Sequence, residues 1–251
     1  MGPPGEEVTP AEVAVGETLD FVLRALGTAP LRLLEVGGGR GELAAALQAR
    51  GHAVTMIDPD PEAVAAARAA GVTALPIGLL EHEGGPYEAV LFVRSLHHLD
   101  EPRSALARTE RLLAPRGLVV VEEFARERAD LLTAAMAFDL ETILAAAGVL
   151  RSPPRDEEAG PETDPLRRWQ ARYGRERGLP GGAEIRALLE ERFQLVRAEP
   201  CPYLYRHLGQ WLEPSERGAA VARALLEVER ARLERGELAP LGLRLIARRR
   251  P

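Results

Sequence analysis

The sequence predicts an α/β fold in which helices cover both faces of a parallel sheet. Short apolar runs, typical of buried strands, alternate with longer helical patterns from residue 31 to residue 124. Glycines at the ends of several of these patterns favour helix termination there. Alternation of strand and helix along a chain indicates a parallel sheet. A chain of 251 residues is long enough for one large domain of this class.

The elements expected after a first helix over residues 10–26 follow in a regular order. We expect strands over residues 31–36, 53–57, 72–77, 88–93, 118–122, 193–198 and 241–247. We expect further helices over residues 42–50, 61–70, 100–113, 126–148, 166–177, 183–192 and 216–235. Residues 1–9 are expected to be disordered and residues 151–165 to form a proline-rich linker, whereas residues 201–209 are ambiguous between strand and loop. Residues 10–251 are then expected to form a single domain, with residues 125–192 and 201–240 as cap or insert segments.

A glycine-rich turn at residues 37–41 follows the first strand and precedes a helix. Glycine lets the backbone turn tightly and approach a ligand without a Cβ in the way. The amides at the start of the following helix favour electronegative groups. The second strand ends in Asp58, an acid that can accept hydrogen bonds from both hydroxyls of a ribose. Strand, glycine turn, helix, strand and acid is the order of a nucleotide-binding α/β unit.

The spacing of the glycines separates two classes of nucleotide site. The dinucleotide pattern GxGxxG, begun at Gly37, requires a third glycine at position 42, which is Glu42. The pattern present is acid-x-G-x-G-x-G, formed by Glu35, Gly37, Gly39 and Gly41. On these residues the chain resembles the class I methyltransferases that use S-adenosylmethionine, and most of all their small-molecule branch, of the methyltransferase type 11/12-like kind.

The resemblance implies both a fold and a cofactor site. The family has a Rossmann-like seven-stranded sheet with helices on both faces, to which we expect this chain to add a small helical cap. S-adenosylmethionine would lie at the carboxyl ends of the first, second and fourth strands. The residues that the resemblance assigns to the cofactor are Glu35, Gly37, Gly38, Gly39, Gly41, Asp58, Pro59, Leu79, Leu80, Val93 and Arg94. The loop after the third strand departs from the family, which commonly places an acid beside the adenine amino group; either Glu81 serves from a shifted position, or backbone, Leu79 and Leu80 hold the adenine.

A second motif lies in residues 87–102, YEAVLFVRSLHHLDEP. Small-molecule methyltransferases resemble this stretch in their aromatic residue, acid, apolar strand and leucine-histidine-histidine run. The candidate catalytic residues are His98, as a base, and Arg94, whereas at least one residue of the histidine doublet is expected to pack structurally. Methyl transfer from a sulfonium is an in-line displacement catalysed mainly by positioning, and a base is needed only where the acceptor must lose a proton.

Aromatic residues form only 4% of the chain and concentrate in the segments expected to form the cap. Such side chains suit an apolar or aromatic small molecule held by a few polar groups, in a pocket between the carboxyl edge of the sheet and the cap. Core packing is the alternative for each of them. The candidates for contacts with the acceptor are Phe124, Trp169, Tyr173, Tyr203 and His207. The sequence does not identify the acceptor or its reacting atom.

Composition bounds the partners and the compartment. A net charge of −6 argues against a chain built mainly to hold nucleic acid. The single cysteine, Cys201, excludes an internal disulfide, so we expect a cytoplasmic protein. No apolar run approaches the ~20 residues that span a bilayer, and no cluster has metal-ligand spacing. We therefore expect a small-molecule acceptor, no nucleic acid, no membrane and no metal, with a monomer or homodimer as the oligomeric state.

Three other interpretations remain open. An NAD-dependent oxidoreductase on a similar sheet is disfavoured by Glu42. An aminopropyltransferase such as spermidine synthase is disfavoured by the short stretch before Leu31, which leaves no room for that family's N-terminal strands. A methyltransferase-like binding protein without catalysis is disfavoured by the intact glycines and Asp58, but the departure near Glu81 keeps this interpretation open.

Overall fold

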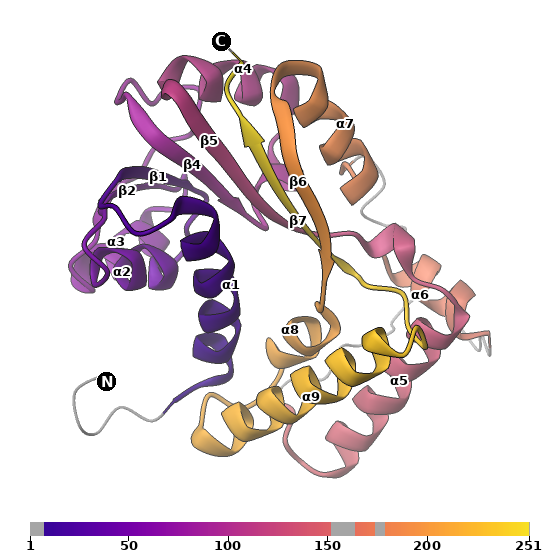
Figure 1. The fold of residues 1–251 in the computed structure, drawn as a ribbon. Coiled ribbons are helices and arrows are strands. Elements are labelled where there is room, and N and C mark those ends of the chain that lie inside the picture. The colour runs from indigo at the N-terminus through magenta and orange to yellow at the C-terminus, as the bar shows by residue number, and fades with distance from the viewer. Residues whose placement is uncertain (1–7, 152–163, 174–178, 251) are drawn as a thin grey trace. The chain divides into compact units, whose positions relative to one another are not determined.

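The computed structural model describes residues 8–151, 164–173 and 179–250 (Figure 1). Contacts within the chain divide it into two compact units, each described by itself below. The sheet unit contains Glu17–Phe124, Pro180–Glu199 and Leu243–Pro251. The helical unit contains Met1–Gly16, Ala125–Leu179 and Pro200–Gly242. The expected disorder of residues 1–9 falls almost wholly, and the expected linker at 151–165 largely, outside the described residues.

The sheet has seven strands in the described residues, in the order β3-β2-β1-β4-β5-β7-β6. The strands are β1 (Arg32–Val36), β2 (Ala53–Ile57), β3 (Thr73–Leu75), β4 (Tyr87–Val93), β5 (Leu113–Phe124), β6 (Gln194–Cys201) and β7 (Gly242–Arg248). Strand β1 pairs in parallel with β2 and with β4, and the pairs β2–β3 and β4–β5 are parallel too. The predicted α/β class with a seven-stranded sheet is therefore confirmed.

Strand β7 runs antiparallel to β5. The amide of Ala125, just beyond the end of β5, donates to the carbonyl of Leu241 before the start of β7 at 2.7 Å. At the other end, the amide of Arg249 after β7 donates to the carbonyl of Gly117 near the start of β5 at 2.9 Å. Contacts at opposite ends of the two strands require opposite directions, so the sheet is mixed.

The helices follow the strands closely in sequence. They are α1 (Pro10–Leu26), α2 (Glu42–Gln48), α3 (Pro61–Ala69), α4 (Pro102–Leu112), α5 (Leu131–Ala146), α6 (Pro165–Tyr173), α7 (Gly182–Arg192), α8 (Leu204–Gly209) and α9 (Glu216–Glu234), with 3₁₀ turns η1 (Leu96–His98) and η2 (Arg126–Arg128). Side-chain caps begin several of them: Asp60 accepts from the Glu62 amide at α3, and Asp130 accepts from the Thr133 amide at α5. Such caps satisfy amides that have no partner within the helix.

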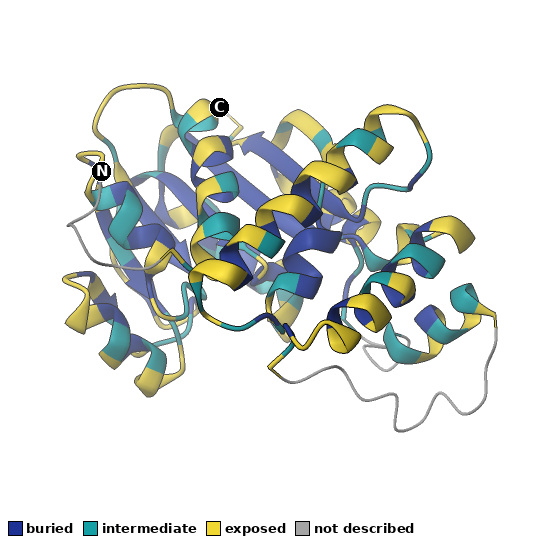
Figure 2. Cartoon of the chain, turned by 90° about the horizontal axis from the view of Figure 1, so that it is seen from below, coloured by how far each residue is buried: buried dark blue, intermediate teal, exposed yellow. Residues whose placement is uncertain are grey.

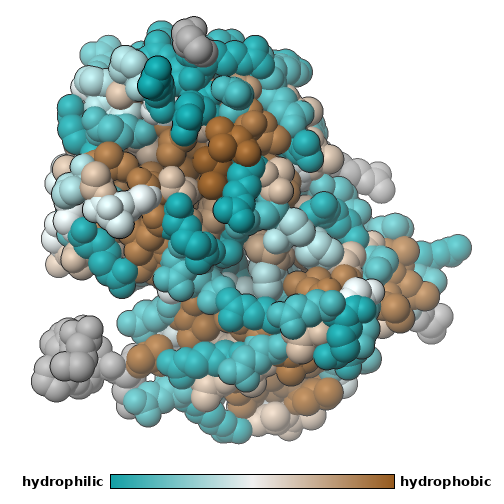
Figure 3. Space-filling view, viewed as in Figure 1, coloured by the Kyte–Doolittle hydropathy of each residue, from teal (hydrophilic) through white to brown (hydrophobic). Residues whose placement is uncertain are grey.

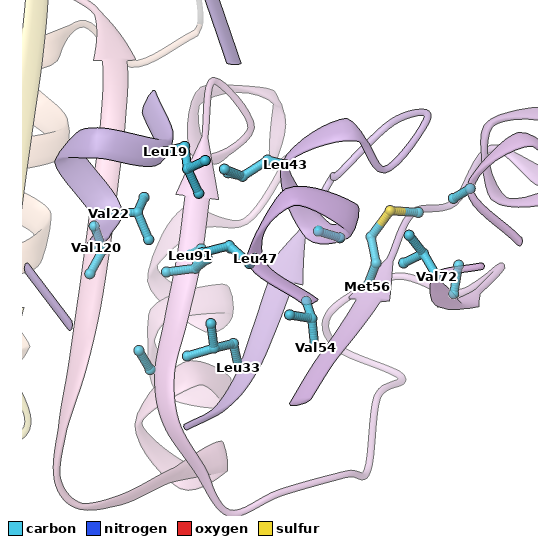
Figure 4. Packing of buried hydrophobic residues seen from close by; sticks show 14 of the residues in the cluster. Leu19, Val22, Leu33, Leu43, Leu47, Val54, Met56, Val72, Leu91 and Val120 are labelled. Atoms are coloured by element: carbon cyan, nitrogen blue, oxygen red, sulfur yellow. The ribbon is translucent and has the colours of Figure 1, made fainter. Parts of the chain in front are cut away.

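Both faces of the sheet are buried. On one face, Leu33, Leu91 and Val120 pack in a hydrophobic cluster with residues of α1, α2 and α3 (Figure 4). Their neighbours in the strands, such as Leu34 and Val90, are equally buried on the opposite face, where Figure 1 shows α4 and α7. Successive residues of a strand point to opposite faces, so continuous burial along β1 and β4 means that both faces are covered. Figure 2 shows these strands as buried and the outer helix faces as exposed.

A few large hydrophobic side chains remain exposed on each unit, as the brown patches in Figure 3 illustrate. They are Val8, Leu80, Leu131, Leu132, Ile143, Val196 and Val228. Val196 lies on β6, at one edge of the sheet, where most side chains are exposed. The remaining exposed residues are mostly polar, which is the ordinary distribution for a folded chain.

Several expected boundaries were wrong. The ambiguous stretch 201–209 contains the end of β6 and helix α8. The fifth strand begins at Leu113, five residues earlier than expected, because Leu113 already pairs with Tyr87. The helix expected over residues 126–148 is the turn η2 followed by the capped helix α5. The helix expected from residue 100 is α4, which begins at Pro102, the residue type whose fixed φ suits a first helical position.

Candidate functional site

The glycine turn between β1 and α2 has the left-handed backbone that its sequence predicts. Gly37, Gly39 and Gly41 have φ angles of 68°, 57° and 81°. Residues with a Cβ rarely adopt such angles. The turn is held in place by a 2.8 Å hydrogen bond from the Gly37 amide to the carbonyl of Ile57 in β2, and Gly41 leads directly into α2.

The glycines of this turn differ in what surrounds them. A Cβ added at Gly37 would lie 2.7 Å from the Cβ of Ser95, and one at Gly41 would lie 2.8 Å from the Cβ of Ala67. A Cβ at Gly38 would lie 2.5 Å from the side chain of Met56. A Cβ at Gly39 would meet nothing within 4 Å. The surrounding chain therefore explains the small residue at three of these positions, whereas Gly39 faces open space with a strained backbone angle.

Asp58, after the end of β2, is tied to the middle of the glycine turn. One carboxylate oxygen accepts from the Gly39 amide and the other from the Asp60 amide, both at 2.9 Å. Asp60 caps α3 with its own side chain. Asp58 is only half-buried, and each carboxylate oxygen has a second lone pair, so further acceptor capacity remains. Pro59 beside it is exposed.

Glu35 lies at the same edge of the sheet, near the end of β1. It is 3% exposed, and its Oε2 has no hydrogen-bond partner among the described residues. Burial, with the nearby acids Glu42 and Asp58, raises the pKa of Glu35 to about 8. A buried carboxyl without a full set of partners is costly. A bound ammonium or hydroxyl group would donate a hydrogen bond to this unpaired oxygen.

Ser95 adds a second buried polar atom without a partner in the described chain. Its Oγ is buried and unpaired, and it follows the end of β4 in contact range of Gly37. Between β4 and Ser95, Arg94 is exposed and has a φ of 56°, uncommon for a residue with a side chain. Its amide donates to the carbonyl of Glu122 at 2.8 Å. Val93 is half-buried beside it.

The loop after β3 shows where the candidates for the adenine contact lie. Leu79 is buried, Leu80 is 51% exposed, and Glu81 is exposed. The carboxylate of Glu81 accepts from the Gly78 amide of its own loop at 3.2 Å. Glu81 therefore has a local role in shaping the loop, and a role toward adenine stays a prediction.

The two neighbouring histidines of η1 lie in different environments. His97 Nδ1 lies 2.5 Å from Glu123 Oε2, and the two rings of the doublet are 3.9 Å apart. His98 is exposed, whereas the His97 side chain is only 12% exposed. His97 is held by Glu123, a partner that was not anticipated from the sequence. That at least one member of the doublet packs structurally stays a prediction.

The comparison with known protein families decides the identity of this arrangement. A family profile described as a methyltransferase domain matches residues 12–192. The chain belongs to this methyltransferase family. The predicted relation to class I methyltransferases is confirmed by the match and by the fold.

Two relatives illustrate what the chain is similar to. It is 29% identical over 117 residues to a ubiquinone biosynthesis O-methyltransferase of Xylella fastidiosa (strain M23), covering 43% of this chain and 48% of that protein. It is 31% identical over 114 residues to the tRNA 5-carboxymethoxyuridine methyltransferase of Escherichia coli (strain K12), covering 41% and 44%. The chain thus spans about half the length of the curated relatives it matches.

A solved structure shares the fold over almost the whole chain. The 1,6-didemethyltoxoflavin-N1-methyltransferase of Burkholderia thailandensis, determined with 1,6-didemethyltoxoflavin and S-adenosylhomocysteine bound, aligns with a TM-score of 0.53 and 19% identity. The alignment covers 96% of this chain and 80% of that chain. At this identity the likeness supports the methyltransferase fold and no more.

The residues at the sheet edge fit the methyltransferase cofactor. S-adenosylmethionine has a ribose diol and an amino acid group with an ammonium. Asp58 offers acceptors for the diol, and the unpaired Glu35 oxygen is an acceptor for hydrogen-bond donors on the amino acid group. The open side of Gly39 lets a ligand approach the backbone, as the family's glycine turn requires.

Four of the predicted acceptor residues lie in the helical unit of the methyltransferase, where three of them form one aromatic cluster. Trp169 is 2% exposed, and its ring centroid lies 4.3 Å from that of Tyr173. The Tyr173 hydroxyl contacts His207 Nε2, and burial with the charge of Arg172 lowers the pKa of His207 to about 4. Tyr203 is buried, and its amide donates to Glu229 at 2.8 Å. These contacts explain the residues as core packing, and contact with an acceptor stays a prediction.

The fifth predicted acceptor residue, Phe124, belongs to the sheet unit of the methyltransferase. It is half-buried at the end of β5, next to the fully buried Glu123. Sequence reasoning missed Glu123, although it lies at the end of an apolar strand at the carboxyl edge. The signal that could have found Glu123 is the same that identified Glu35, an acid at the end of a buried strand.

Neither a metal site nor a membrane-spanning helix is present among the described residues. In the part of the chain that the structure describes, no group of histidine, cysteine, aspartate or glutamate side chains has the arrangement of a metal site. Over the same residues, no helix combines the length and hydropathy needed to cross a bilayer.

Proposed function

We propose that this chain transfers a methyl group from S-adenosylmethionine to a small-molecule acceptor. The observation that carries the proposal is the left-handed glycine turn, open at Gly39, tied to Asp58 and placed beside the buried Glu35. Family membership supports the same activity. When bound, S-adenosylmethionine supplies a methyl group already activated on a sulfonium.

In this proposal the chain's residues act mainly by binding and orientation. Asp58 accepts hydrogen bonds from the ribose hydroxyls, and Glu35 faces the ammonium. The glycines of the turn allow the backbone to approach the amino acid part of the cofactor; they are Gly37, Gly38, Gly39 and Gly41. Five further residues complete the site: Pro59, Leu79, Leu80, Val93 and Arg94. Holding reactants in line corresponds to effective molarities of about 10⁵–10⁸ M. Orientation therefore suffices for much of the rate acceleration.

The acceptor is proposed to be a small molecule. The net charge of −6 supports this choice over a nucleic acid, although one relative is named for tRNA modification. Arg94 and His98, both exposed, are the polar groups proposed to face the reacting atoms. Phe124 ends β5, the parallel strand that pairs with β4. The residues of the helical unit that are proposed to contact the acceptor are Trp169, Tyr173, Tyr203 and His207.

Localisation in the cytoplasm as a monomer or homodimer completes the proposal. The lone Cys201 supports a reducing compartment. Sedimentation equilibrium measures the oligomeric state directly.

Thermal unfolding with three ligands tests the cofactor. Ligand at a hundredfold excess over its Kd stabilises a folded protein by about 2.7 kcal/mol. We expect S-adenosylmethionine and S-adenosylhomocysteine to raise the Tm and NAD to leave it unchanged. A rise with NAD alone would instead favour the oxidoreductase interpretation. Binding of S-adenosylmethionine without methylation of any acceptor would favour a binding protein.

A further inference from the structure

Glu123 holds His97 through both of its carboxylate oxygens. Oε2 lies 2.5 Å from His97 Nδ1, and Oε1 accepts from the amide of Leu96 at 2.9 Å and more weakly from that of His97 at 3.4 Å. Glu123 is fully buried. Three contacts from one buried carboxyl fix both the turn η1 and the orientation of the imidazole ring.

These contacts determine which ring nitrogen carries the hydrogen. Backbone amides donate to Glu123 Oε1, so this oxygen acts as a hydrogen-bond acceptor. A carboxylate accepts hydrogen bonds only, so Oε2 takes its bond from a hydrogen on His97 Nδ1. The neutral ring therefore carries its hydrogen on Nδ1, and Nε2 keeps a lone pair. This is the arrangement that orients a histidine as a base.

The pair lies at the edge of the sheet where the cofactor site is proposed. Strands β4 and β5 are adjacent and parallel, so their carboxyl ends, which carry His97 and Glu123, meet at one edge. Ser95, two residues before His97, is in contact range of Gly37 in the glycine turn. Ligands of open α/β sheets bind at this edge, near the point where strand order reverses between β1 and β4.

We propose that His97 is the general base of the methyltransferase, that Glu123 is its positioning residue, and that the acceptor reacts through a hydroxyl oxygen. The inference rests on the proposed function. The hydroxyl proton passes to His97 Nε2, and the oxygen pair that it leaves forms the new bond to the methyl carbon. The carbon–sulfur bond breaks with its electron pair remaining on sulfur. The resulting imidazolium is stabilised by the Glu123 carboxylate and later loses its proton to solvent.

A hydroxyl is the acceptor that needs such a base. A phenol has a pKa of about 10 and a histidine one of about 6.5, so the oxygen gains nucleophilicity as the proton moves in the transition state. A carboxylic acid, with a pKa of about 4, is already ionised at neutral pH. A neutral amine attacks with a lone pair that is already available. Phenolic hydroxyls are therefore the acceptor class that this pair fits best.

One experiment needs no acceptor. Nitrogen-15 NMR of the imidazole rings, with His97 assigned by its loss in His97→Asn, reports where the neutral ring carries its hydrogen. We expect Nδ1–H in the unmodified protein and a shift toward a mixture of tautomers in Glu123→Gln. A ring with hydrogen on Nε2 alone would overturn the proposal, since that atom could not accept a proton.

The second experiment separates a base from a tether. In His97→Asn the amide nitrogen can replace Nδ1 and keep the contact with Glu123, but nothing replaces Nε2. Turnover is measured as S-adenosylhomocysteine formed with a panel of phenols, aliphatic alcohols, benzoic acids and amines. We expect phenols to react, and His97→Asn to lower kcat by about 10²–10⁴-fold and to remove the acidic limb of the pH profile, with nearly unchanged cofactor affinity.

A matched control is His52→Asn. His52 is a buried histidine just before β2, where its Nδ1 accepts from the Leu31 amide at 3.3 Å, and it is outside the proposed site. This variant should keep the unmodified pH profile. An unchanged kcat in His97→Asn would overturn the inference. So would turnover of acids or amines alone, or the absence of turnover with every hydroxyl compound in the panel. Calorimetry with S-adenosylmethionine on the same samples distinguishes these outcomes from failure of the proposed function, in which the cofactor would not bind.

Discussion

The carboxylate of Asp58 accepts a 2.9 Å hydrogen bond from the amide of Gly39, which joins the acid after β2 to the middle of the glycine turn. The bond places an acceptor for ribose hydroxyls and the open side of the turn next to one another. It also means that the two most informative residues of the sequence motif depend on each other. Substitution of the acid should therefore change the turn as well as the ligand contact.

Asp58→Ala should weaken the affinity for S-adenosylmethionine by roughly 10- to 100-fold, since a hydrogen bond to a charged group contributes about 1.5–3 kcal/mol. Isothermal calorimetry measures the change. The matched control is Asp60→Ala, which removes the cap of α3 and should cost about 0.5–2 kcal/mol of stability without altering cofactor affinity. Equal affinity in Asp58→Ala and the unmodified chain would contradict the ribose assignment.

Gly39→Val should abolish cofactor binding more completely than Asp58→Ala. The substitution forces a branched side chain onto a φ of 57° and projects it into the open space that a ligand would enter. Gly51→Val is the control, because Gly51 has a φ of 91° and equally open surroundings outside the site. The two variants should lose comparable stability, while only the first loses binding by calorimetry. Normal binding in Gly39→Val would show that the turn does not approach the ligand.

Glu35 should make the free energy of unfolding depend on pH. Its pKa is about 8 when folded and near 4.5 in an unfolded chain, so the folded state binds more protons between these values. Its contribution to stability is therefore lost as pH rises from about 4.5 to about 8, by roughly 1.4 kcal/mol per pH unit. Urea unfolding at several pH values measures the free energy of unfolding of the unmodified chain and of Glu35→Gln. We expect the difference between these two free energies to change with pH by this slope. A difference that does not depend on pH would show that Glu35 is not buried as described.

The buried ion pair between Arg244 of β7 and Glu122 of β5 should make a single substitution costly. Arg244 Nε lies 2.6 Å from Glu122 Oε2, and the side chains are 8% and 2% exposed. Arg244→Met leaves a buried carboxylate short of its cation and should destabilise the fold by about 3–5 kcal/mol in urea unfolding. The double variant Arg244→Met/Glu122→Gln should recover much of this loss. If the double variant were as unstable as the single one, the cost would lie in packing and not in charge.

The sequence predicts the local features of this chain well because their causes are local. The left-handed turn follows from glycine spacing, and the cap of α3 follows from Asp60 beside Pro61. The order of strands and helices follows from the spacing of apolar residues. The acid pattern at Glu35 and Asp58 also placed both at the edge where the structure has them.

What the sequence could not predict depends on distant contacts. In the doublets His97-His98 and Glu122-Glu123, alternation shows that neighbours face different ways but not which one faces a given partner. Helix α8 was missed because its first amides are satisfied by Glu229, about 25 residues away, and not by a local cap. The early start of β5 depends on the pairing of Leu113 with Tyr87. Pro115 and Gly117 are residue types that favour a turn, so the sequence indicated a later start for this strand.

The position of β7 between β5 and β6 has a consequence for how the polypeptide emerges from the ribosome. β7 is translated after every other strand, yet it separates two strands made earlier. Until residues 242–248 are available, the backbone groups along one side of both β5 and β6 have no β7 to pair with, and such open edges promote association between chains. Nascent molecules would therefore depend on rapid completion, or on chaperones, during this interval.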